Sequence, residues 1–231
     1  MKLQFLILSL LFFAAFEKNI AQCNNEYFAF EEGTKYEMTH YDAKGRVSSM
    51  VKNTINFAAE SSTGGYEIQI NSVVLDKDGD EVSSGDFLMN CKDDVITLDI
   101  NSLVNPGLTN MQANAEISIS GAGAIFPPEL TPGETLPDGE TEIEVSTNGV
   151  KFMTIRMNQS NRRVVGKKKI TTKAGTFDCV EINYDFEVKM LIRKTFTVKE
   201  WFAKGVGLVK SETYDKKDRL ESSSELTAFS K

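Results

Sequence analysis

The sequence predicts an all-β protein in which a single curved antiparallel sheet closes into a barrel or half-barrel, with at most one short helix. The longest regular pattern, within Gly175–Tyr214, alternates strictly between apolar and polar residues, which is the period of a strand with one buried face. Turn-forming groups such as Asp76–Asp80 recur about every 8–12 residues, as in sheets of short antiparallel strands. One segment, Leu103–Ala115, has a weak helical pattern, and Pro106-Gly107 interrupt it.

The first half of the chain divides into strands at these turns. Asp42–Gly45 and Asp76–Asp80 are expected to be hairpin turns, because Asp can cap a turn with its own side chain and Gly accepts the left-handed conformation. Apolar and β-branched residues between the turns predict strands over residues 35–41, 47–57, 66–74, 82–91 and 95–100.

The second half begins with extended residues near Ile117 and a long loop, Gly121–Gly139, which holds four of the five prolines. Loops of this length are usually functional or mobile, and we expect this one to cover the mouth of the sheet. A hairpin around Asn148-Gly149 follows. Further strands are predicted over residues 164–172, over two long stretches that meet near Met190–Lys194, over 208–214, and after Asp215–Asp218 to a point near residue 229.

The central alternation predicts a continuous apolar surface on the concave side of the sheet. Every second side chain of a strand lies on the same face, so the apolar residues of this stretch should share one face and its polar residues the other. The candidate concave apolar face consists of Val180, Ile182, Tyr184, Phe186, Val188, Met190 and Trp201.

Residues 1–21 are interpreted as a secretory signal peptide, and residues 22–231 as a single β-rich domain. Lys2 supplies the positive start, residues 3–16 are apolar, and a polar segment follows with cleavage expected after Ala21 or Gln22. The apolar run is shorter than the ~20 residues of a membrane-spanning helix. We therefore expect an exported protein, periplasmic or extracellular. A lipoprotein anchored at Cys23 is the less favoured alternative, because Gln22 is larger than the residue that normally precedes a lipidated cysteine.

The net charge restricts the classes of partner, and the cysteine count restricts the possible disulfides. The net charge is −7, and removal of residues 1–21 takes away two lysines and one glutamate and leaves −8. An acidic protein is a poor candidate for nucleic acid, or for an anionic membrane as its main partner. Three cysteines in an oxidising compartment permit one disulfide and one free thiol. Because Cys179 falls on the polar face of its strand, where a free thiol would be exposed, we favour pairing of Cys23 with Cys179.

Residues that could support catalysis or metal binding are sparse. His40 is the only histidine and lies beside Tyr36 and Met38 on one strand face, which favours a packed or hydrogen-bonded side chain. The carboxylate pairs Glu31-Glu32 and Asp93-Asp94 lie at turns, where solvated charge is usual. Asp76–Asp80 resembles the start of a calcium-binding loop, but the residues that should complete that loop are Glu81 and Phe87, so a hairpin turn is favoured.

The basic residues Arg162-Arg163 and Lys167–Lys169 are interpreted as a solvated strand edge that discourages aggregation. We expect no cofactor, no metal, no catalytic residue and no nucleic-acid partner.

Two motifs resemble a family of exported bacterial proteins. The segments Thr171–Cys179 (TTKAGTFDC) and Glu200–Glu212 (EWFAKGVGLVKSE) carry the likeness, and Tyr27–Thr34, Thr131–Gly139 and Tyr214–Lys217 extend it over most of the chain. The family is known as a domain of unknown function, also called TapB-like. The resemblance implies a curved antiparallel sheet of the lipoprotein-carrier type around an apolar interior, and it supplies no catalytic residue.

The sequence leaves the function open among three classes. The favoured hypothesis is an exported non-enzymatic module that holds a hydrophobic ligand, or a lipidated partner, in the concave sheet; its partner would be a hydrophobic small molecule or an envelope protein. The alternative is a structural or interaction protein with a filled core. A hydrolase that uses carboxylates is the remote third possibility.

Overall fold

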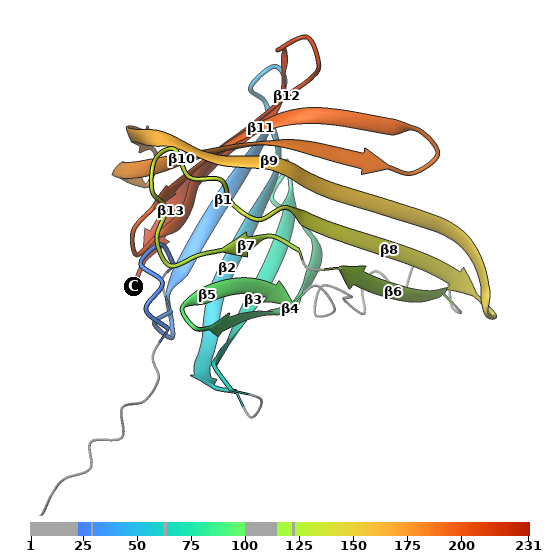
Figure 1. Cartoon of the computed structure of the whole chain (residues 1–231), viewed down its shortest axis with the longest axis horizontal. Helices are drawn as coiled ribbons and strands as arrows, with labels where there is room; N and C mark the ends of the chain where they lie inside the picture. Colours follow the sequence, from blue (N-terminus) through green and yellow to red (C-terminus); the bar gives the residue numbers. More distant parts are fainter. Residues whose placement is uncertain (1–22, 29, 62–63, 100–114, 122) are drawn as a thin grey trace, which may run out of the picture.

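The structure is a computed structural model that describes residues 23–28, 30–61, 64–99, 115–121 and 123–231. Its described residues form thirteen strands in one antiparallel sheet (Figure 1). The strands are β1 (Lys35–Asp42), β2 (Val47–Glu60), β3 (Tyr66–Asp76), β4 (Glu81–Lys92), β5 (Val95–Asp99), β6 (Ala115–Gly121), β7 (Ile125–Phe126), β8 (Gly139–Thr147), β9 (Val150–Thr172), β10 (Gly175–Lys189), β11 (Arg193–Ala203), β12 (Gly207–Tyr214) and β13 (Leu220–Ser230).

The strand order is β6-β8-β9-β10-β11-β12-β13-β1-β2-β3-β4-β5-β7, so the first and last parts of the chain meet at the β13–β1 pair. No ladder within the described residues joins the edge strands β6 and β7, and the sheet is therefore a curved half-barrel that hydrogen bonds do not close. This confirms the predicted all-β class. Residues 1–22, which include the predicted signal peptide, and residues 103–114 of the predicted helix lie outside the described residues; Ala115 begins β6.

The central alternation forms β10 and β11, joined by a turn at residues 190–192, where a bend or turn was expected. Directly opposed residues of an antiparallel pair lie on the same face. Val180 lies opposite Phe202, and Glu181 lies opposite Trp201. Trp201 is therefore on the face of Glu181 and not on the face of Val180. The assignment of Trp201 to the concave apolar face is wrong. The prediction carried the alternation of β10 on toward Trp201, but β11 is a separate strand that begins after the turn at residues 190–192, and its own register decides which of its residues face inward.

The contacts of two aromatic side chains, Phe28 and Phe126, show that the sheet is curved. One buried cluster lies on β9–β11 and another on β2–β5, at opposite parts of the sheet. Phe28 and Phe126 pack against both clusters, with their ring centroids 5.4 Å apart. A side chain can contact both parts only if the sheet curls around it. We call the face that carries these two clusters the inner face, and the other the outer face.

The half-barrel has a filled end and an open end. At the filled end, residues 23–28 and 127–137 cover the inner face and contribute Tyr27, Leu130 and Leu136 to the core. The amide of Leu136 donates to the carbonyl of Arg162 at 2.8 Å, so this loop runs alongside β9. At the open end lie the β8–β9 and β10–β11 turns, on the side of the molecule opposite the N-terminal segment (Figure 1). The long loop therefore covers the filled end rather than the mouth.

Three hairpin turns share one capping arrangement. The carboxylate of Asp42 accepts hydrogen bonds from the amides of Lys44 and Arg46, at 2.9 Å each. The carboxylates of Asp76 and Asp215 accept from the amides two and four residues later in the same way. This confirms that Asp76–Asp80 is a hairpin turn. In the Asp42 and Asp215 turns a neighbouring arginine also donates to the carboxylate and lowers its pKa to about 2.

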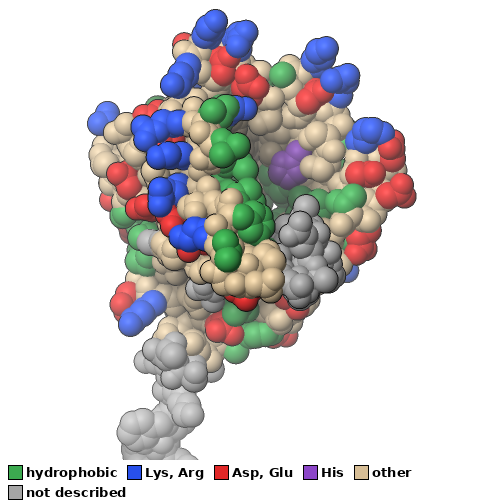
Figure 2. All heavy atoms as spheres, turned by 90° about the vertical axis from the view of Figure 1, so that its right-hand side faces the viewer, with side chains coloured by type: hydrophobic (Ala, Val, Ile, Leu, Met, Phe, Trp, Pro, Cys, Tyr) green, Lys and Arg blue, Asp and Glu red, His purple; other side chains and the backbone are tan. Residues whose placement is uncertain are grey.

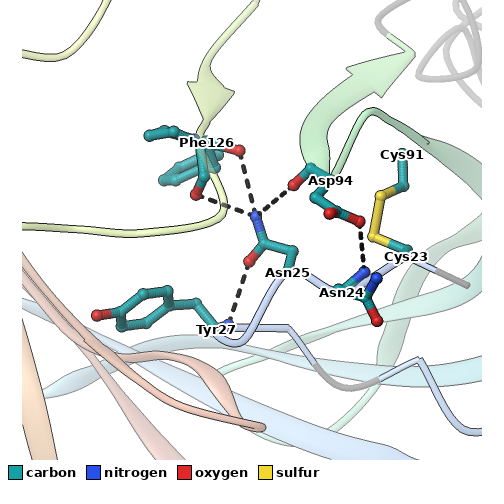
Figure 3. The surroundings of a disulfide bond; sticks show 8 residues. Cys23, Asn24, Asn25, Tyr27, Cys91, Asp94 and Phe126 are labelled. Atoms are coloured by element: carbon teal, nitrogen blue, oxygen red, sulfur yellow. Dashed lines mark hydrogen bonds between the residues drawn. A yellow bond between two sulfur atoms is a disulfide. The ribbon is translucent and has the colours of Figure 1, made fainter.

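The disulfide joins Cys23 to Cys91, with their Cα atoms 5.9 Å apart (Figure 3). The predicted Cys23–Cys179 pair is wrong. Cys23 and Cys91 both pack at the cluster of β2–β5 on the inner face. Cys179 lies on the outer face, only 1% exposed beneath Trp201. The prediction assumed that this face of β10 is solvated, whereas a second apolar cluster buries the free thiol there.

Asn25 fixes the N-terminal segment next to this disulfide. Its side-chain Nδ2 donates to the carbonyls of Asp94, Phe126 and Pro127 at 3.1–3.3 Å (Figure 3). Its side-chain Oδ1 accepts from the backbone amide of Tyr27. Asn25 therefore joins the N-terminal segment to the β4–β5 turn and to β7. The disulfide and this buried amide together hold the segment that fills one end of the half-barrel.

Candidate ligand-binding site

Along β10 the inner face changes from buried to exposed. Val180, Ile182 and Tyr184 are at most 8% exposed, Phe186 and Val188 are half-buried, and Met190 is 49% exposed. Five of the seven residues of the predicted apolar face, Val180 to Val188, thus lie on one face of β10 in the predicted order, and Met190 follows in the β10–β11 turn. They do not form one continuous binding surface, because those near the filled end are core residues and only those near the open end are accessible.

The accessible part of the inner face continues onto the neighbouring strands. Direct cross-strand partners place Ile119, Ile143 and Ile155 in one row across β6, β8 and β9, and Met157 beside Val188. Most of these side chains are only half-buried. We define the open-end apolar face as Ile117, Ile119, Ile143, Val145, Met153, Ile155, Met157, Phe186, Val188 and Phe196.

Figure 2 looks onto the open end and shows a hollow there. Apolar side chains line one wall of the hollow, and the only histidine of the chain lies inside it. The sequence offered a signal for the part on β8 and β9: Ile143 and Val145 alternate with Glu142 and Glu144, as the residues of β10 do. The prediction was restricted to the longest alternating run and so missed these strands.

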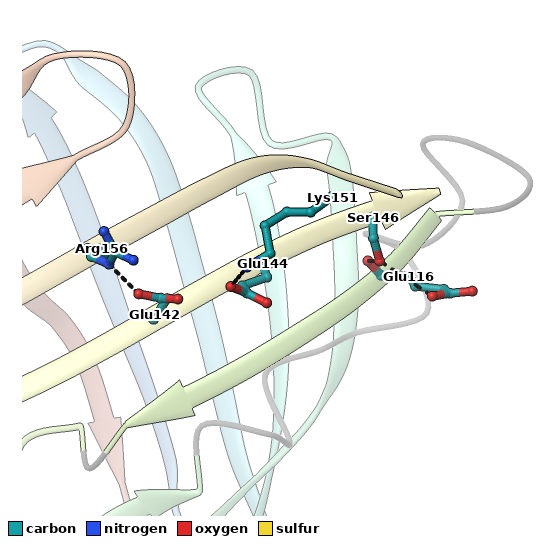
Figure 4. A network of polar contacts seen from close by, with 6 residues as sticks. All are labelled: Glu116, Glu142, Glu144, Ser146, Lys151 and Arg156. Atoms are coloured by element: carbon teal, nitrogen blue, oxygen red, sulfur yellow. Dashed lines mark hydrogen bonds and ion pairs between the residues drawn. The ribbon is translucent and has the colours of Figure 1, made fainter. Parts of the chain in front are cut away.

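The outer face of the same strands is charged. Glu142 pairs with Arg156, and Glu144 pairs with Lys151 (Figure 4). Hydrogen bonding from Arg156 lowers the pKa of Glu142. Ion pairs exposed in this way contribute little stability, but they keep this face in water. At the open end, therefore, the inner face of the sheet is apolar and the outer face is charged and hydrated. Water can reach both faces.

Arg162 is a buried residue that the sequence did not identify as such. Its side chain is on the inner face at 1% exposure, and its Nη1 donates to the carbonyls of Ile125 and Pro137 at 3.0 and 2.6 Å. The predicted solvated edge is wrong for this residue, because β9 lies inside the sheet and has an extra residue near Asn161, whose φ is 56°. Arg162 holds the long loop against the sheet at the boundary of the filled end.

Two more polar residues lie near Arg162. The hydroxyl of Tyr184 donates to Glu200 Oε1 at 3.0 Å. Burial raises the pKa of Glu200, while the hydrogen bond from Tyr184 and the charge of Arg162 act in the opposite direction. Burial also lowers the pKa of Arg162, whose reference value is so high that it stays charged. Arg162, Tyr184 and Glu200 therefore place charged and polar groups beside the buried apolar cluster of β9–β11.

His40 does not form a catalytic triad in the described part of the chain. Its Nδ1 and the Oγ of Ser224 are 2.6 Å apart, and burial lowers the pKa of the imidazole. A serine nucleophile needs a base that a third group orients, and no carboxylate of the described residues bonds to His40. The expected hydrogen-bonded histidine is confirmed.

The carboxylate pairs have structural surroundings. Asp93 and Asp94 form the two-residue β4–β5 turn with φ values of 52° and 62°, and Asp94 accepts from the amide of Asn24 at 2.7 Å. Glu31 and Glu32 are exposed, and Glu31 pairs with Lys231. Among the described residues no group of three His, Cys, Asp or Glu side chains could hold a metal ion. The same part of the chain contains no helix that is long and apolar enough to span a bilayer.

Comparison with known proteins found one family model and two solved structures of similar fold. A family model described as DUF3108-like matches residues 31–226. Two solved structures are similar in fold. One is a candidate exported protein with a YmcC-like fold from Bacteroides fragilis NCTC 9343, with a TM-score of 0.70 and 23% identity over 90% of this chain and 100% of that one. The other is a candidate lipoprotein from Parabacteroides distasonis ATCC 8503, with a TM-score of 0.69 and 24% identity over 89% and 99% of the two chains. No curated protein matched.

Proposed function

The chain belongs to the DUF3108-like family, and from that premise we propose that it is an exported, non-enzymatic module that holds a hydrophobic ligand, or the lipid of a lipidated partner, on the inner face of its half-barrel. The observation that carries the proposal is the open-end apolar face, whose side chains share the inner face of neighbouring strands, at the end of the molecule where Figure 2 shows a hollow with an apolar wall. Soluble proteins rarely leave such a face accessible unless something binds to it.

Export is supported by two observations. A disulfide such as Cys23–Cys91 forms and persists in oxidising compartments outside the cytoplasm, and both similar structures are described as exported or as a lipoprotein. We infer that no lipid is attached to Cys23 of this chain, because the sulfur atom that would carry it is bonded to Cys91.

The size of the expected affinity follows from simple estimates. An acyl chain that buries about twelve methylene groups gains roughly 10 kcal/mol, at about 0.8 kcal/mol for each group. Association costs at least about 4 kcal/mol in lost translational and rotational freedom. At this lowest cost the difference corresponds to a dissociation constant of roughly tens of micromolar, which is the tightest binding expected and is within reach of a fluorescence titration.

A pair of neighbouring substitutions tests the proposal. Ile155 and Thr154 are adjacent on β9; Ile155 lies on the inner face opposite Ile143, and Thr154 on the outer face opposite Glu144. We expect Ile155→Asp to weaken the binding of a fluorescent fatty acid about tenfold or more, because a bound acyl chain would bury the new carboxylate. Thr154→Asp should change the affinity less than about twofold, since its carboxylate stays in water.

The alternative function, a structural or interaction protein with a filled core, is favoured by one observation: the filled end is closely packed by Tyr27, Leu130 and Leu136. It predicts no saturable fatty-acid binding by the wild-type protein. Equal affinities in the Ile155→Asp and Thr154→Asp variants would likewise contradict a ligand on the inner face. Both variants should be checked for unchanged strand content by circular dichroism before the titration.

A further inference from the structure

We propose that the β10–β11 turn is a membrane-binding tip that inserts into the surface of a bilayer carrying anionic phospholipids. Met190, Leu191 and Ile192 are consecutive and have exposures of 49%, 101% and 68%. Three adjacent large apolar side chains gain nothing from contact with water, and such a run on a protruding turn is a mark of an interaction site. The inference goes beyond the proposed ligand binding and does not depend on it.

The basic residues on either side of the turn indicate that the membrane surface it binds is anionic. Lys189 precedes the apolar residues, and Arg193 and Lys194 follow them. Lys189 lies directly opposite Arg193 on β11 and opposite Arg156 on β9. Three like charges are thus placed in one row across three neighbouring strands, an arrangement that destabilises a sheet unless anions balance it.

The protein itself balances this row only in part. Arg156 pairs with Glu142, and Arg193 Nε lies 3.3 Å from Glu187 Oε1. Lys189 forms no ion pair with another described residue. An apolar tip bordered by uncompensated positive charge is complementary to a bilayer surface, where phosphate head groups lie just above the acyl chains.

A second turn lies on the same side of the molecule. The β8–β9 turn extends toward the side reached by the β10–β11 turn (Figure 1), and it carries Val150 and Phe152 at 68% and 58% exposure. Two exposed apolar turns on one side can reach a common plane. The hollow of the open end faces this side as well (Figure 2).

The acidic character of the whole chain does not oppose this docking mode. The net charge of −7 is a sum over the whole chain, while interactions between exposed charges are screened beyond about 8 Å at physiological ionic strength. The charges nearest the tip therefore dominate its approach to the bilayer. The expectation that an anionic membrane is not the main partner rested on the total charge and did not consider the positive charges next to this one turn.

Vesicle co-sedimentation with the full protein tests the proposal. We expect binding to vesicles of phosphatidylcholine mixed with phosphatidylglycerol, and weaker binding to phosphatidylcholine alone. Leu191→Asp should lower the partition coefficient about tenfold or more, because a charge replaces an inserted apolar side chain. Lys189→Gln should lower it about fivefold on the anionic vesicles only, as expected for one basic residue at an anionic surface.

Val82 provides a matched control, since it is 62% exposed on a different hairpin, and Val82→Asp should leave vesicle binding unchanged. Equal losses in Val82→Asp and Leu191→Asp, or no binding by the wild-type protein, would overturn the proposal. Self-association that Leu191→Asp abolishes, without vesicle binding, would assign the tip to a second copy of the chain and also overturn it. Leu191→Asp should keep its fatty-acid affinity and Ile155→Asp its vesicle binding, so the two proposals can fail separately.

Discussion

Loss of the Cys23–Cys91 disulfide is expected to lower the free energy of unfolding by about 4 kcal/mol. The bond links residues separated by 68 positions, and the chain-entropy estimate for a loop of that length gives this value. It also fixes the start of the segment that fills one end of the half-barrel. Chemical denaturation of a Cys23→Ser/Cys91→Ala variant, compared with the wild-type protein, measures the difference.

Reductant provides the control. It should destabilise the wild-type protein and leave the double variant unchanged, because Cys179 is buried on the outer face and forms no disulfide. Burial raises the pKa of the Cys179 thiol to about 11, so this thiol should not react in the folded protein at neutral pH. A Cys91→Ala variant whose stability still responds to reductant would contradict the Cys23–Cys91 pairing.

Ile182→Ala is expected to destabilise the protein by about 2–5 kcal/mol, the usual effect of truncating a fully buried aliphatic side chain. Ile182 is 0% exposed in the cluster that Tyr27 and Leu136 complete. Glu187→Ala, on the outer face of the same strand, should change stability by no more than about 0.5 kcal/mol, because its ion pair with Arg193 is exposed. Chemical denaturation of the two variants makes the comparison, and similar effects would contradict the assignment of the two faces of β10.

The sequence predicts the strands well because their signals are local. The alternation of β10 and the Asp-capped turns depend on residues close together in the chain, and the structure confirms both. A family of unknown function with a curved sheet was also recognised correctly from local motifs.

What the sequence could not predict depends on contacts between distant residues. Pairing of Cys23 with Cys91 requires the N-terminal segment to lie on the inner face of β4, which no local pattern indicates. Arg162 is buried because an extra residue near Asn161 changes the alternation of β9, and because the long loop offers it two carbonyls. The position of Trp201 depends on how many residues the β10–β11 turn contains.

The division of the inner face into a filled and an open end has the same origin. The alternation of β10 is uniform from Val180 to Val188, yet the first residues are core and the last are accessible. The difference arises from Tyr27, Leu130 and Leu136, which come from segments far away in the chain and cover only one end. A pattern within one strand cannot show which part of its face another segment will cover.

Native mass spectrometry of the protein purified from its own cell envelope tests most directly whether the inner face holds a hydrophobic ligand. We expect a fraction of the wild-type protein to carry one lipid-sized adduct. The Leu191→Asp variant should retain this adduct, and the Ile155→Asp variant should lose it, because only Ile155 belongs to the open-end apolar face. A wild-type spectrum with the mass of the protein alone, or an adduct that Ile155→Asp leaves in place, would contradict ligand binding on the inner face.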